Sequence, residues 1–254
     1  MGVTCLVRWK NATGMRDFTY IAEHVTKTLH GKNTGPWSLS FKVFRDINSQ
    51  GMQQQQAPPP TPSSTTTTTN TTTTTTTSSS QPTPASSSQP PPSLKSQPAS
   101  SHAYTKESKL LYQVSLAQQP KHVYCMVEGS VVIEAEKELE LILLRLKNLW
   151  QLRQSVTIEG TSYDIGDFTL RVANILLGST YKGLLLEIEY HPCSTPNRTR
   201  QLLEEFIASI VPSSAQLSCE YEYNFEQVGL SGHEFTIAHT SYQYMHLFRN
   251  DGLF

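Results

Sequence analysis

The chain has 254 residues, and its 20 Lys and Arg are balanced by 21 Asp and Glu, which leaves a formal net charge of −1. This balance argues against a protein that works by neutralising phosphates, because such proteins carry an excess or a stripe of basic residues. No apolar run approaches the ~18 residues that cross a membrane, so we expect no membrane partner.

Before residue 48 the hydrophobic pattern predicts three elements. They are a strand at Val3–Arg8, a helix at Asp17–His30 and a strand at Trp37–Arg45. The helix rests on apolar residues spaced three and four apart, and the second strand rests on strict alternation of apolar and polar residues. This fragment is too small to be stable alone, so we expect it to join a larger sheet.

A low-complexity tract of Gln, Pro, Ser and Thr follows, and Lys95 is the only charged residue between Gln53 and Ser101. These residue types bury too little apolar area to offset the entropy of ordering a chain. We therefore predict a single domain over residues 1–254, interrupted by a disordered loop at residues 48–103.

After the tract, the pattern predicts strands, helices and strands in alternating groups. The strands are Leu110–Leu116, His122–Val127, Ser130–Glu134, Val156–Glu159, Phe168–Leu177, Leu184–Tyr190 and Leu217–Phe225, and the helices are Glu136–Leu152, Asn197–Val211 and Thr240–Arg249. Consecutive strands without helices between them indicate antiparallel pairing. We predict an α+β fold, in which a large antiparallel sheet closes into a barrel-like shape with helices packed against it.

None of the candidate catalytic or metal-binding patterns in the sequence matches the motif that it resembles. Glu187 and Glu189 share one face of a strand at a spacing that suits the two carboxylates of a glycosidase, but alternate acids are usually the solvated face of a strand. The pair His233-Glu234 is followed by His239, which is too far along for a zinc helix. The sequence therefore predicts no catalytic, metal-binding or cofactor-binding residues and gives no reason to infer an enzyme.

The four cysteines lie far apart and form no CxxC pair, so the sequence does not predict a metal knuckle. They are Cys5, Cys125, Cys193 and Cys219. We expect reduced, buried thiols that pack like small apolar side chains.

Aromatic residues are dense towards the C-terminal end of the chain, and aromatics serve both cores and protein interfaces. For Tyr221, Tyr223 and Phe225 the core interpretation is favoured. A second group is a candidate partner interface, with core packing as the alternative: Tyr242, Tyr244, Leu247 and Phe248.

Four short motifs together resemble the Mediator complex subunit 20 family. They are Met1-Gly2-Val3-Thr4-Cys5; Gly160-Thr161-x-Tyr163-x-x-x-Asp167-Phe168-x-Leu170-Arg171-Val172; Gly183-x-x-x-Glu187-Ile188-Glu189-Tyr190-x-Pro192-Cys193; and Tyr242-Gln243-Tyr244-Met245-x-Leu247-Phe248. Each motif alone is weak, but the set covers both ends and the middle of the chain.

The resemblance implies a nuclear, non-enzymatic structural subunit of the Mediator head module, with a fold similar to that of the TATA-binding protein. It implies a direct pair with Mediator subunit 18, attachment through subunit 8 to the rest of the head, and an indirect link from activators to RNA polymerase II. Direct nucleic-acid binding is not expected, because a basic, groove-wedging surface is not evident. The alternative function is a sequence-independent nucleic-acid-binding module that uses a TATA-binding-protein-like sheet.

Overall fold

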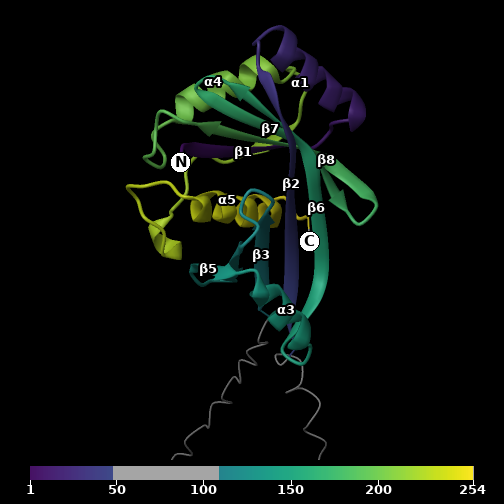
Figure 1. The fold of residues 1–254 in the computed structure, drawn as a ribbon, viewed down its shortest axis with the longest axis vertical. Coiled ribbons are helices and arrows are strands. Elements are labelled where there is room, and N and C mark those ends of the chain that lie inside the picture. The colour runs from purple at the N-terminus through teal and green to yellow at the C-terminus, as the bar shows by residue number, and fades with distance from the viewer. Residues whose placement is uncertain (48–108, 254) are drawn as a thin grey trace, which may run out of the picture. The chain divides into compact units, whose positions relative to one another are not determined.

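The computed structural model describes residues 1–47 and 109–253 (Figure 1). The loop predicted at residues 48–103 lies outside them. The described residues build an α+β fold around a large antiparallel sheet, as the sequence predicts. Strands from before residue 48 pair with strands from after residue 108, so the N-terminal fragment does join the larger sheet.

The sheet has nine strands in the order β5-β4-β3-β2-β6-β7-β8-β1-β9. Their bounds are β1 (Val3–Trp9), β2 (Lys32–Asp46), β3 (Leu110–Leu116), β4 (His122–Val127), β5 (Val132–Glu136), β6 (Trp150–Ile165), β7 (Phe168–Leu177), β8 (Thr180–Tyr190) and β9 (Leu217–Cys219). The helices are α1 (Met15–Lys27), α3 (Glu138–Arg145), α4 (Arg200–Ile210) and α5 (Ile237–Asn250).

The sheet is open, so the expected closure into a barrel is wrong. Its two ends are β5 and β9, which have five and three residues and do not pair with each other. Very short edge strands offer few unpaired backbone groups, which limits edge-to-edge aggregation without closure.

Helices cover both faces of the sheet where β1, β7 and β8 run (Figure 1). On one face, Leu184, Leu186 and Ile188 of β8 share a core cluster with buried residues of α1 and α4. On the other face, Leu185 lies in a second cluster with the inner side of α5. Because alternate residues of one strand enter different clusters, β8 is buried on both sides.

Two predicted elements are much shorter in the structure. The helix predicted over Glu136–Leu152 is only α3, because the chain turns after Arg145 and begins β6 at Trp150, which pairs with Asp46 of β2. The strand predicted over Leu217–Phe225 is only β9. Beyond it, the Asn197 side-chain amide donates to the Tyr223 carbonyl oxygen at 3.0 Å and thus replaces a strand partner.

Gly160 allows β6 and β7 to approach each other closely. An added Cβ at this position would lie 1.9 Å from the Val172 carbonyl oxygen and 2.5 Å from the Ala173 Cα. No other residue fits without moving a strand, which gives a physical reason for this glycine in the second sequence motif.

Candidate functional site

The predicted partner interface falls on α5, and most of it is buried inside the chain. Tyr244 and Phe248 are fully buried and Leu247 is 4% exposed. The ring of Phe248 meets Phe41 of β2 edge-on, with 5.2 Å between ring centroids. Within the chain these three side chains pack in the core, which is the alternative that the sequence left open, and a partner interface at these residues stays a prediction. Tyr242 is only partly buried, and its role at an interface stays a prediction.

The prediction that Glu187 and Glu189 form the exposed side of their strand is wrong. They are 2% and 7% exposed, because their side of β8 faces α5 and the start of the chain. Arg171 of β7 donates to both: Nη1 to Glu187 and Nη2 to the Glu189 Oε2 at 3.1 Å. The carboxylates are therefore partners of a guanidinium whose side chain is only 14% exposed.

Further donors complete this network. The Tyr244 hydroxyl donates to the Glu187 Oε2, and the Gly2 backbone N–H donates to the Glu189 Oε1 at 3.1 Å. Each of the four carboxylate oxygens thus accepts at least one hydrogen bond. We name Arg171, Glu187, Glu189 and Tyr244 the buried charge network. It ties α5 to β7, β8 and the N-terminal residues.

Burial sets the electrostatics of the buried charge network. Burial raises the pKa of Glu187, and the nearby Arg171 and the Tyr244 hydrogen bond oppose that rise only in part. Burial also raises the pKa of Tyr244 well above its ordinary value, so its hydroxyl stays a donor. Burial disfavours the charged form of Arg171, but Glu187 and Glu189 outweigh it and raise the pKa of the guanidinium. The sequence shows the acids, but their alternation alone did not reveal Arg171 as their partner.

A second polar anchor holds the C-terminal end of α5. The Asp251 carboxylate accepts three hydrogen bonds. Its Oδ2 accepts from Arg8 Nη1 at 3.0 Å, and its Oδ1 accepts from Lys10 Nζ at 2.8 Å and from the Ser218 hydroxyl at 2.6 Å. Burial would raise the pKa of Asp251, but the hydrogen bonds from Lys10, Ser218 and Arg8 lower it below its ordinary value. Asp251 therefore connects α5 to β1 and β9 as a carboxylate.

A third anchor lies at the N-terminal end of α5. Thr236 and His239 form a reciprocal capping box, in which the Thr236 backbone N–H donates to the His239 Nδ1 at 3.0 Å. His239 Nε2 lies 2.8 Å from the Ser231 carbonyl oxygen. Because burial lowers the pKa of His239, the ring stays neutral and can donate through Nε2 while Nδ1 accepts. Fixed in this way at both ends, α5 is a rigid element.

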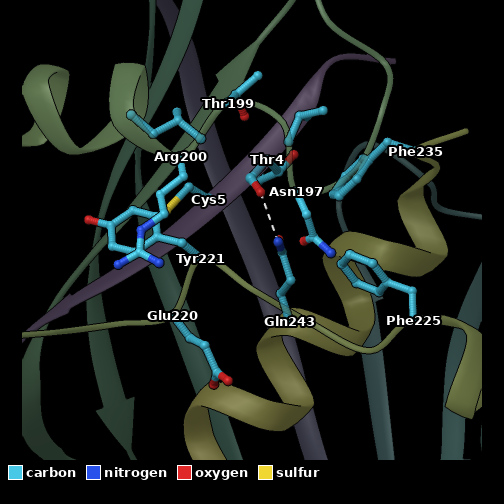
Figure 2. A pocket seen from close by; sticks show the side chains of 12 residues that line it. Thr4, Cys5, Asn197, Thr199, Arg200, Glu220, Tyr221, Phe225, Phe235 and Gln243 are labelled. Atoms are coloured by element: carbon cyan, nitrogen blue, oxygen red, sulfur yellow. Dashed lines mark hydrogen bonds between the residues drawn. The ribbon is translucent and has the colours of Figure 1, made fainter. Parts of the chain in front are cut away.

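The cavity beside α5 and β1 is too small for a substrate (Figure 2). Its volume is about 10 Å³, which admits at most a single water molecule. Figure 2 shows Gln243 of α5 reaching to β1, where its Nε2 donates to the Thr4 carbonyl oxygen at 2.8 Å. Cys5 lies in the same lining, and burial raises its thiol pKa far above the ordinary value. This thiol is not activated for nucleophilic chemistry.

A larger cleft of about 180 Å³ lies over the buried charge network. Arg171, Glu187 and Glu189 form part of its lining, together with Leu116 and Ile237. The acidic oxygens that it reaches already accept hydrogen bonds from the chain itself. The cleft therefore presents no free pair of carboxylates for acid–base chemistry.

A groove of about 290 Å³ crosses the face of β2, β3 and β6 next to α3, and its charges are mixed. The Lys42 Nζ lies 3.3 Å from the Glu140 Oε2, and Glu159 also lines the groove. A surface that binds nucleic acid without sequence preference needs unpaired cations along the backbone track. This face does not provide such a track.

In the part of the chain that the structure describes, no cluster of three or more His, Cys, Asp or Glu side chains could hold a metal ion. Within the same residues, no helix has the length and hydropathy to span a membrane. The four cysteines are free, and Cys5 and Cys125 are buried.

Comparison with known proteins identifies the family. A family model described as the TATA-binding related factor of subunit 20 of the Mediator complex matches residues 1–249. Mediator of RNA polymerase II transcription subunit 20 of Schizosaccharomyces pombe is 36% identical over 109 residues, which are 42% of this chain and 55% of that protein. Subunit 20b of Arabidopsis thaliana is 30% identical over 145 residues, which are 54% of this chain and 65% of that protein.

The human Mediator subunit 20 is 28% identical over 107 residues, which cover 41% of this chain and 50% of that protein. The matched region thus spans about half to two thirds of the length of these relatives. A solved structure of a Pyrococcus horikoshii OT3 protein covers 90% of this chain and 99% of its own, with 12% identity and a TM-score of 0.39. That likeness is too loose to support a conclusion.

Proposed function

Because this chain belongs to the family of Mediator subunit 20, we propose that it is a non-enzymatic structural subunit of the Mediator head module. In this role it is a transcription coregulator that helps to link DNA-bound activators to RNA polymerase II. The observation that carries the proposal is the family match, which extends over residues 1–249 and so includes nearly all of the described fold. The proposed location is the nucleus, where this machinery works.

The geometry supports a binding role over a catalytic one. The two acids that resembled a catalytic pair, Glu187 and Glu189, are committed to Arg171, Tyr244 and a backbone N–H. The thiol of Cys5 is buried with a raised pKa. Three polar anchors fix α5 against the sheet, which suits a subunit that offers a rigid surface to its neighbours.

The proposed partners are Mediator subunit 18, which pairs directly with this chain, and subunit 8, which connects the pair to the rest of the head. Direct contact with nucleic acid is not part of the proposal, and the ion pair of Lys42 with Glu140 supports leaving it out. We also propose that residues 1–254 form one domain with an inserted loop at 48–103. The pairing of β2 with β3 across that insertion supports it.

The test is co-expression of the full chain with subunit 18 of the same organism, followed by size-exclusion chromatography and titration calorimetry. We expect a stable one-to-one complex. A parallel titration with a fluorescein-labelled DNA duplex at physiological salt should show no binding. A well-folded chain that does not bind subunit 18 but binds the DNA duplex would overturn the proposal in favour of a nucleic-acid-binding module.

A further inference from the structure

The outer side of α3, the turn after it and the start of β6 carry a set of exposed large apolar side chains. Their exposed fractions are 58% for Leu141, 50% for Ile142, 48% for Leu144, 38% for Leu146, 41% for Leu149 and 43% for Leu152. We name these six residues the leucine patch. Large apolar side chains that gather on one surface mark interaction sites, whereas single exposed leucines need no explanation.

The leucine patch is not a frayed end of the core, because α3 is fixed to the sheet. Leu143 is 4% exposed and packs with Phe44 and Leu111 on the inner side of α3. Glu140 accepts from Gln113 at 2.7 Å and from Ser115 at 2.8 Å, and it pairs with Lys42. Burial would raise the pKa of Glu140, but the Ser115 hydrogen bond and the nearby Lys42 lower it below its ordinary value, so the carboxylate stays charged. The chain thus holds α3 in place with its apolar side facing outwards.

The turn after α3 is fixed as well. Leu149 donates its backbone N–H to the Leu146 carbonyl oxygen at 2.9 Å, and its own carbonyl oxygen accepts from the Ile47 N–H at 3.0 Å. A surface that is ordered before binding loses little conformational entropy when a partner docks.

Three cations are interspersed with the residues of the leucine patch along the chain. Arg145, Lys147 and Arg153 are exposed, and among the described residues none of them makes an ion pair. The sequence from Leu141 to Ile158 contains no Asp or Glu. The complementary surface therefore has an apolar centre and carboxylates at its rim.

Neither the composition of residues 48–108 nor the charges of a second copy match that surface. Residues 48–108 contain Met52, Leu94 and Tyr104 as their only large apolar side chains and Glu107 as their only acid. Self-association across a two-fold axis would bring the three cations near their own copies, which repel each other.

We propose that the leucine patch is the docking surface for an apolar, carboxylate-rimmed segment of a partner subunit. This inference rests on the proposed function, because it takes the chain to be part of a larger assembly. Apolar contact supplies the affinity, and the cations set the orientation and the speed of association.

The test uses the full chain and the recombinant pair of subunits 18 and 8 from the same organism, with binding followed by calorimetry. Leu144→Asp and the uncharged Leu144→Ser should each weaken binding by about tenfold or more if the side chain is a central contact. The matched control is Leu202→Asp on α4, where the leucine is 40% exposed. The control should bind like the wild type, and circular dichroism should show that all variants fold.

The charges are tested separately with Arg145→Glu combined with Lys147→Glu. We expect slower association and a weaker dependence of the dissociation constant on salt concentration than in the wild type. The matched control is Arg198→Glu, a charge reversal at an exposed residue near α4 that should leave both quantities unchanged.

Three outcomes contradict the inference in different ways. If the wild type binds the pair and both Leu144 variants bind equally well, the leucine patch is not the docking surface, while the proposed function stands. If the wild type does not bind the pair, the proposed function fails and the inference fails with it. If sedimentation velocity shows a dimer of the chain alone that Leu144→Asp dissociates, the occupant is a second copy.

Discussion

Arg171 and Glu187 lie opposite each other on β7 and β8, and their ion pair is buried beneath α5. The Tyr244 hydroxyl of α5 donates to the same carboxylate, so one acidic side chain joins two strands and a helix. Because this contact links elements that are far apart in the sequence, its loss should loosen the whole fold.

Replacing Arg171 by Met should destabilise the chain strongly. The change leaves Glu187 and Glu189 buried without their cation, and removing one partner of a buried pair costs about 3 to 5 kcal/mol. Urea unfolding followed by circular dichroism measures this loss. Arg200→Met is the matched control, because Arg200 pairs with Glu204 and Glu222 at the surface and should be nearly neutral. Equal losses in both variants would show that the buried charge network has no special role in stability.

Glu187→Gln should change how stability depends on pH. The folded-state pKa of Glu187 is raised above the ordinary 4.5, so the folded chain holds this proton more tightly than the unfolded chain. Its contribution to stability is therefore full at low pH and is lost as the pH rises through the folded-state pKa. The difference in unfolding free energy, wild type minus variant, should fall as the pH rises above 4.5. A difference that grows with pH would contradict the assignment.

Asp251→Asn should show the opposite trend. The folded-state pKa of Asp251 is lowered below the ordinary 3.8, so its contribution is full above that pH and is lost as the pH falls through the folded-state pKa. The variant should be less stable than the wild type at neutral pH, and the gap should shrink in acid. Urea midpoints measured from neutral to acidic pH test this. A gap that stays constant would mean that Asp251 is not held as a carboxylate by Arg8 and Lys10.

Gly160→Ala should lower the stability of the chain far more than the addition of one methyl group suggests. The new Cβ would lie 1.9 Å from the Val172 carbonyl oxygen, so β6 and β7 must separate, at a cost of at least about 1 to 3 kcal/mol. Gly232→Ala is the matched control, because its new Cβ would meet only the end of the Glu226 side chain, at 2.7 Å, and that side chain can move. Thermal unfolding compares the two, and similar midpoints would disprove the close approach.

Removing residues 53–101 should leave the thermal midpoint nearly unchanged. Their composition offers little apolar area to any core. Calorimetric scans of the full chain and the shortened chain measure the difference. A large drop in the midpoint would show that the tract contributes to the folded structure.

Three strands were predictable together with their bounds. The ranges predicted for β3, β4 and β7 are those found, because clear turn signals bound each run of β-forming residues. The end of α3 was not predictable from periodicity, since the apolar spacing continues past Arg145. Pairing of Trp150 with Asp46, a contact between distant residues, overrides that local pattern.

The buried charge network could not be derived from sequence for a different reason. At the β7–β8 turn, Leu177 pairs with Thr180 and Leu176 with Tyr181, and continuing that register would place Arg171 opposite Leu186. An irregularity between Asn174 and Leu176 shifts the pairing by one residue, which brings Arg171 opposite Glu187. Neither composition nor residue spacing predicts where a β-bulge occurs. A shift of one residue in the pairing nevertheless decides which side chains lie opposite each other.

The position of β1 has a consequence for how the chain is made. This strand pairs with β8 and β9, and Gly2 bonds to Glu189 across a sequence separation of 187 residues. At about 5 to 20 residues per second, the ribosome needs on the order of 10 to 40 seconds to deliver that partner. Until then, β1 lacks its partner strands β8 and β9, and its apolar side chains are not covered by them. The sheet can therefore form around β1 only after β8 and β9 have been synthesised, and apolar surface exposed during that delay is prone to aggregation.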